Sequence, residues 1–179
     1  MYLRDACKIV KKYGDAPEAT IGGNTEQPKC TQELESKLNE SIYDKAKEFK
    51  IKSYALCKKE KDIKYALFTS GPVLASIKWY DKYKLKADKT IEFNKKTNYG
   101  YHAIMIYGYN EYGWLCQNSW GRNWNKDGRF ILPYSEKFQE AWTFIDATSE
   151  EIYIPTNNSI FDILYKGLNI LLNLIKKLV

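Results

Sequence analysis

The stretch from residue 98 to residue 124 brings together side chains that could handle the proton of a thiol. His102 is the only histidine of the chain and opens the apolar run YHAIMIYGY, while Asn118 and Trp120 close the next run, GWLCQNSW. An imidazole can take the proton of a thiol, and an asparagine oxygen can orient that imidazole through its far nitrogen. A tryptophan ring laid over this hydrogen bond would keep water away from it. The stretch therefore holds a possible base and the group that orients it.

Two adjacent strands would place these side chains together. His102 lies near the start of the first run and Asn118 at the end of the second, so the two meet across a hairpin. Gly108, Asn110 and Gly113 lie between the runs and suit the turn that such a hairpin needs.

The combination of HAIMIYGY with GWLCQNSWGRNWNKDGRFIL resembles the papain-like cysteine peptidases, the cathepsin family. The matching residues are His102-Ala103, Gly108-Tyr109, Trp114, Asn118-Ser119-Trp120-Gly121, Trp124 and Gly128. Asn125 stands where the family usually has glycine. The resemblance runs from about residue 2 to about residue 147. It implies that His102 is the general base, Asn118 its orienting partner and Trp120 the shield.

The resemblance leaves the nucleophile unaccounted for. In the family the attacking cysteine lies in a Gly-x-Cys-Trp segment at the start of a long helix, ahead of the region that YLRDACKIV matches, and these 179 residues lack that segment. Cys7 is expected as a core residue of a helix, Cys57 ends a strand beside two lysines, and Cys116 lies on the strand that leads to Asn118. Cys30, in a loop, is the remaining candidate nucleophile.

Around the hairpin the sequence predicts an α+β chain, a papain-like half-fold with an antiparallel, barrel-like sheet. Residues 2–13 show helical spacing, and residues 31–48 begin with a capping-box pattern at Thr31. The expected strands are IKSYALC, PVLASIKWY, YHAIMIYGY, GWLCQNSW, GRFILPY and AWTFIDA, with a short helix in KDIKYALFTSG that Gly71 stops and a polar, lysine-rich connection over residues 80–98.

These elements suggest four parts. Residues 1–48 would be the remnant of a helical subdomain, residues 49–148 the barrel-like subdomain with the histidine and the asparagine, and residues 149–158 a linker. Residues 159–179 are predicted as an amphipathic helix that docks on a partner or associates with itself, with membrane-surface binding a third alternative. Its heptad-like seam consists of Phe161, Leu164, Leu168, Leu171, Ile175 and Leu178.

Composition excludes several classes of protein. The chain has a formal charge of +6 and only three arginines, so its positive charge comes almost entirely from lysine. It contains neither an arginine cluster nor an aromatic-basic motif, and nucleic-acid binding is therefore not expected. One histidine and irregularly spaced cysteines argue against a metal site, and no cofactor is expected. The first residues carry charges throughout and no long apolar stretch follows, so we expect a cytoplasmic or virion protein without a signal peptide or a transmembrane helix.

Two functions remain open. In the first, another chain supplies the Cys-bearing helix and completes a cysteine peptidase that is inactive without it. In the second, the chain is a non-catalytic structural or binding component of a phage, viral or other assembly. Under both, the family's absent central helix would leave apolar surface on the sheet and on the helix at 2–13 uncovered, and such surface usually marks a protein interface.

Overall fold

The computed structural model describes residues 2–16 and 39–146. Three expectations lie outside these residues: the capping box at Thr31, the loop that carries Cys30, and the linker with the apolar helix at 159–179. Among the described residues, no helix is long and apolar enough to cross a membrane.

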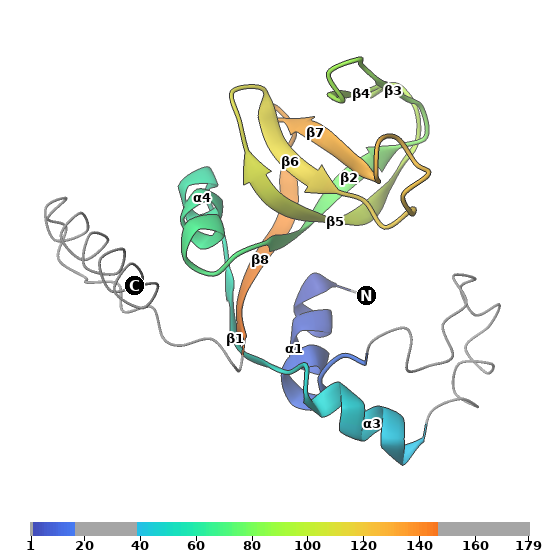
Figure 1. Cartoon of the computed structure of the whole chain (residues 1–179). Coiled ribbons are helices and arrows are strands. Elements are labelled where there is room, and N and C mark those ends of the chain that lie inside the picture. The colour runs from blue at the N-terminus through green and yellow to red at the C-terminus, as the bar shows by residue number, and fades with distance from the viewer. Residues whose placement is uncertain (1, 17–38, 147–179) are drawn as a thin grey trace, which may run out of the picture. The chain divides into compact units, whose positions relative to one another are not determined.

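The larger sheet has six antiparallel strands, as the sequence predicts (Figure 1). In spatial order the strands are β1 (Ile51–Leu56), β8 (Phe138–Asp146), β2 (Val73–Tyr80), β5 (Tyr99–Tyr109), β6 (Gly113–Gln117) and β7 (Arg129–Pro133). The sheet is open rather than a closed barrel: in the described part of the chain, its edge strands β1 and β7 do not pair with each other. The predicted α+β class and the antiparallel sheet are confirmed.

The predicted connection over residues 80–98 is wrong, because it contains a second small sheet. β3 (Tyr83–Leu85) and β4 (Ile91–Phe93) pair as an antiparallel hairpin. Their apolar residues alternate with lysine or glutamate, a pattern hidden in sequence because each strand is only three residues long. The hairpin is tied to β7 by the Ile131 N–H, which donates to the Lys89 carbonyl oxygen over 2.9 Å.

Three helices accompany the sheet in the described part of the chain: α1 (Leu3–Tyr13), α3 (Glu40–Lys47) and α4 (Glu60–Thr69). α1 and α4 match the expected helices, and α3 covers the end of the one expected over residues 31–48. Asn39 caps α3, since its Oδ1 accepts a hydrogen bond from the Ile42 N–H over 3.2 Å. Gly14 ends α1 at a φ of 92°, and a Cβ there would clash with the Ala46 carbonyl of α3.

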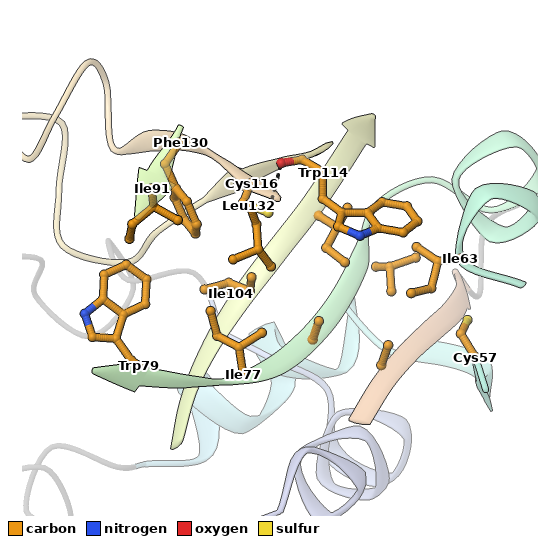
Figure 2. Close-up of a cluster of buried hydrophobic side chains, with 14 of the residues drawn as sticks. Cys57, Ile63, Ile77, Trp79, Ile91, Ile104, Trp114, Cys116, Phe130 and Leu132 are labelled. Carbon is orange, nitrogen blue, oxygen red and sulfur yellow. Dashed lines mark hydrogen bonds between the residues drawn. The ribbon is translucent and has the colours of Figure 1, made fainter. Parts of the chain in front are cut away.

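The core lies on one face of the sheet, which we call the inner face (Figure 2). Every second residue of β2, β5, β6 and β7 points into this core, for example Ile77, Ile104, Cys116 and Leu132. We call the opposite side the outer face. Leu3 of α1 is joined to that face, because its N–H donates to Glu140 Oε1 of β8 over 2.8 Å.

Candidate active site

The pairing of β5 with β6 brings His102 and Asn118 together. Met105 of β5 lies opposite Gln117, the last residue of β6. His102 comes three residues before Met105 and Asn118 directly follows Gln117, so both residues lie at the same end of the strand pair. His102 Nε2 and Asn118 Oδ1 are 2.9 Å apart, a hydrogen-bond distance. Asn118 is only 4% exposed, so this bond is largely removed from water.

The hydrogen bonds of Asn118 decide which nitrogen of His102 carries the proton. The Ser119 N–H, which can only donate, lies 2.7 Å from Asn118 Oδ1 and identifies that atom as the acceptor oxygen. His102 Nε2 must then donate to the same oxygen, so a neutral imidazole carries its hydrogen on Nε2. Nδ1 keeps its lone pair. The arrangement can therefore accept a proton at Nδ1 of His102.

Aromatic rings surround the imidazole. Trp120 lies with its ring centroid 5.0 Å from that of His102, and Trp79 of β2 contacts His102 at 4.9 Å in an edge geometry. Trp120 is 44% exposed, whereas Trp79 is buried at 8%. The imidazole therefore lies between an exposed and a buried tryptophan ring, both at distances typical of aromatic contacts.

The segment after β6 fixes the position of Asn118. The predicted strand GWLCQNSW ends at Gln117, because the Asn118 N–H turns to donate to the Gly128 carbonyl over 2.8 Å. Gln117 Nε2 donates to the carbonyl oxygens of Asn118 and Asp127 and so joins the two ends of the loop between β6 and β7. Asn125, where the family usually has glycine, adopts a φ of 47°, a left-handed conformation that asparagine tolerates better than most residues.

The three cysteines that the structure describes are buried. Cys116 is fully buried, its thiol donates to the Trp114 carbonyl over 3.5 Å, and burial raises the pKa of this thiol far above its usual value (Figure 2). Burial also raises the pKa of Cys7 and of Cys57, with smaller contributions from Glu140 and Asp62 respectively. A raised pKa disfavours the thiolate, the form that attacks a carbonyl.

Sequence reasoning missed Trp79 as a site residue. It belongs to the predicted strand PVLASIKWY, whose pattern predicts only that this tryptophan is a core residue. Its contact with His102 follows from the antiparallel register of β2 and β5, in which Ile77 lies opposite His102 and Trp79 opposite Gly100. Only the pairing of these two strands could have revealed it.

The chain is similar in sequence to known cysteine proteases. A family profile described as "Papain family cysteine protease" matches residues 2–143. "Cathepsin B-like cysteine proteinase 5" of Caenorhabditis elegans is 30% identical over 110 residues, which cover 59% of this chain and 32% of that protein. "Viral cathepsin" of Adoxophyes honmai nucleopolyhedrovirus is 32% identical over 80 residues, or 40% of this chain and 22% of that protein. The chain thus spans about a third or less of these curated relatives.

Solved structures show the same fold. Xylellain, a cysteine protease from Xylella fastidiosa, superimposes with a TM-score of 0.65 at 24% identity, covering 80% of this chain and 60% of that one. ProCathepsin B S9 from Trypanosoma congolense gives a TM-score of 0.57 at 18% identity, covering 82% of this chain and 53% of that one. Since the family profile covers most of the sequence and the hydrogen-bonded histidine and asparagine lie within it, the chain belongs to the papain family of cysteine proteases.

Proposed function

We propose that this chain provides the proton-handling half of a papain-like cysteine peptidase site, and that a segment outside these 179 residues provides the nucleophilic cysteine. The observation that carries the proposal is the hydrogen bond between His102 Nε2 and Asn118 Oδ1, which leaves Nδ1 as the proton acceptor. The catalytic roles of His102, Asn118 and Trp120 are part of this proposal.

The chemistry would proceed in two steps. Nδ1 of His102 takes the thiol proton, and the thiolate sulfur forms a bond to the carbonyl carbon of the substrate peptide. The carbon–nitrogen bond then breaks, and the departing amine receives the proton from the imidazolium, which leaves a thioester. A water molecule, deprotonated by the same imidazole, attacks the thioester and releases the acid and the thiol. Asn118 Oδ1 stabilises the imidazolium in both steps through the Nε2–H bond.

The surroundings of the sheet support a second segment. On the outer face, Met105 and Tyr107 of β5 remain 39% and 38% exposed although they are large and apolar. A hollow of about 760 Å³ between α1 and this face is lined by Leu3, Tyr101 and Ala103, among others. Polar groups of Ser76, Gln139 and Glu140 also line the hollow, and we propose that part of the segment outside these 179 residues packs against it. The cysteine of that segment, with the glutamine that would complete the oxyanion hole, would have to lie beside Nδ1 of His102 on the inner-face side of β5.

The proposal is tested first on the purified full chain. An epoxide inactivator of thiol proteases should label none of its cysteines, including Cys30, and casein should stay intact. Labelling of Cys30 together with casein cleavage would overturn the assignment of the nucleophile to another segment.

The second half of the test supplies the nucleophile. The Cys-bearing segment of the Xylella protease, expressed as a separate polypeptide, is combined with the chain, and the release of peptide fragments is followed. We expect the inactivator to label the added cysteine and cleavage to appear. The His102→Ala variant should lose about 100-fold to 10,000-fold of that activity, the usual contribution of a general base. A full rate in this variant would remove His102 from the mechanism, and Arg122→Ala is the control for an exposed change in the same loop region.

A non-catalytic component of a viral or other assembly is the second candidate function. One observation favours it: the three described cysteines are buried, and burial raises the pKa of each thiol. If the reconstituted pair binds tightly but neither reacts with the inactivator nor cleaves casein, this function is preferred. The predicted helix at 159–179 would then contribute to assembly, and its deletion should change the elution volume of the chain in size-exclusion chromatography.

A further inference from the structure

The β3–β4 hairpin forms a positively charged hollow that the catalytic arrangement does not use. The hollow has a volume of about 820 Å³ and is lined by four lysines and two carboxylates, with Tyr83 and Phe93 also in its wall. The charged lining residues are Asp81, Lys82, Lys84, Glu92, Lys95 and Lys96.

The carboxylates near the hollow neutralise only part of its charge. Glu92 pairs with Lys86 over 3.4 Å, and Lys95 pairs with Glu136 over 2.8 Å. Within residues 2–16 and 39–146, no ion pair involves Lys82, Lys84 or Lys96, and all three are exposed. Their positive charge is therefore available to a ligand, with Asp81 as the one opposing carboxylate among the lining residues that has no ion pair in this region.

A continuous set of aromatic contacts joins this hollow to the imidazole. The Trp79 ring contacts His102 at 4.9 Å and Tyr83 at 5.2 Å between centroids. Trp124, which follows Trp120 in the same loop, donates from Nε1 to the Tyr83 hydroxyl over 3.1 Å. The hollow thus begins one aromatic side chain beyond the residues that contact His102. Because Trp79 is buried, these contacts run through the core; they show that Tyr83, in the wall of the hollow, is separated from His102 by a single side chain.

We infer that the hollow formed by the β3–β4 hairpin binds acidic side chains of the polypeptide that lies across His102. The inference rests on the proposed function, because it takes that polypeptide to be the substrate. Several lysines that have no ion pair in the described part of the chain lie beside a neutral aromatic wall, an arrangement that favours carboxylates. Their exposed position allows the lysine side chains to adjust to such a ligand. The binding is electrostatic and falls as ionic strength rises.

The test measures binding and needs no thiol. Fluorescence anisotropy compares the full chain with a labelled peptide of repeated Glu-Gly-Ser and with the same peptide carrying Gln in place of Glu. The acidic peptide should bind about tenfold more tightly or better at low salt, since single exposed ion pairs are weak but several act together. Equal affinity for the two peptides would overturn the inference.

A matched pair of variants locates the binding. Reversal of the three unpaired lysines (K82E, K84E and K96E together) should weaken binding of the acidic peptide about tenfold. The control reverses three exposed lysines on α1 and around α4 (K11E, K58E and K61E together), which changes the net charge equally and should alter binding less than about twofold. Figure 1 shows α4 and the β3–β4 hairpin at opposite ends of the sheet. Equal losses in both variants would mean that only net charge matters and would overturn the inference.

Two further outcomes separate the ideas. A labelled single-stranded oligonucleotide that binds more tightly than the acidic peptide, and loses affinity in the hairpin variant, would make the hollow a nucleic-acid surface and overturn the inference. Peptide binding that depends on the hairpin lysines, in a chain whose reconstituted pair cleaves nothing, would support this surface while the peptidase proposal fails. Cleavage that shows no preference for acidic substrates would support the peptidase proposal and overturn the role of the hollow.

Discussion

The two faces of β5 differ although their residues alternate along one strand. Ile104 and Ile106 point to the inner face and are at most 2% exposed, whereas Met105 and Tyr107 point to the outer face and are more than a third exposed. His102 belongs to the inner face, where its hydrogen-bond partner and its aromatic neighbours come from this chain. The contrast teaches that His102 is held among side chains packed within this chain, while the outer face keeps large side chains exposed and is proposed to pack against a further segment.

The first way to break this comparison is to truncate one residue on each face. Ile106→Ala should lower the free energy of unfolding by about 2–5 kcal/mol, because it leaves a cavity in a fully packed site. Met105→Ala changes the neighbouring residue of the same strand and should lower the free energy of unfolding by less than about 1 kcal/mol, because this side chain is already in contact with water. Urea unfolding measures both. Similar losses for the two variants would show that the outer face is covered in the isolated chain.

The second prediction sharpens the comparison at Asn118. Asn118→Ala removes the oxygen that accepts from both the Ser119 N–H and His102 Nε2. We expect the free energy of unfolding to fall by about 1–3 kcal/mol and the imidazole to become a mixture of its two tautomers. Nitrogen-15 chemical shifts of the imidazole report the tautomer.

Asn110→Ala is the matched control for that experiment. Asn110 Oδ1 also accepts two backbone N–H groups, from Tyr112 and Gly113, in the turn of the same hairpin. This variant should lower stability but leave the Nε2–H tautomer of His102 in place. If both variants left the tautomer unchanged, the orienting role of Asn118 would be lost.

The smallest effect concerns the thiol buried on the inner face. Burial raises the pKa of Cys116 in the folded chain above the value of 9.0 that is ordinary for a free thiol. The folded state then keeps its proton where the unfolded state loses it, so this contribution to stability is full below about pH 9 and declines as pH rises, by about 1.4 kcal/mol per pH unit.

Urea unfolding at several pH values above 9 checks this slope. Cys116→Ala should make stability less dependent on pH, while Ile104→Ala, a control that removes core volume without a titrating group, should keep the slope of the unmodified chain. A slope that is the same with and without Cys116 would mean that water reaches the inner face.

Short-range patterns in the sequence determined much of the fold. The helices α1 and α4 followed from apolar spacing and from Gly14 and Gly71 at their ends, and the strands of the large sheet followed from alternation. The family likeness followed from the residues around His102 and Asn118, and the family match confirmed it. The catalytic roles, the nucleophile from another segment and the partner surface stay predictions.

Contacts between distant segments decided the rest. The β3–β4 hairpin was missed because its short strands depend on contacts with β7 and with Trp79, which are distant in the sequence. The role of Trp79 beside His102 and the tautomer of the imidazole depend on strand register and on one backbone N–H, that of Ser119. By itself, the sequence determined which residue types were available for proton transfer. Their hydrogen bonds, burial and distances were decided by the tertiary structure, because each depends on groups far apart in the chain.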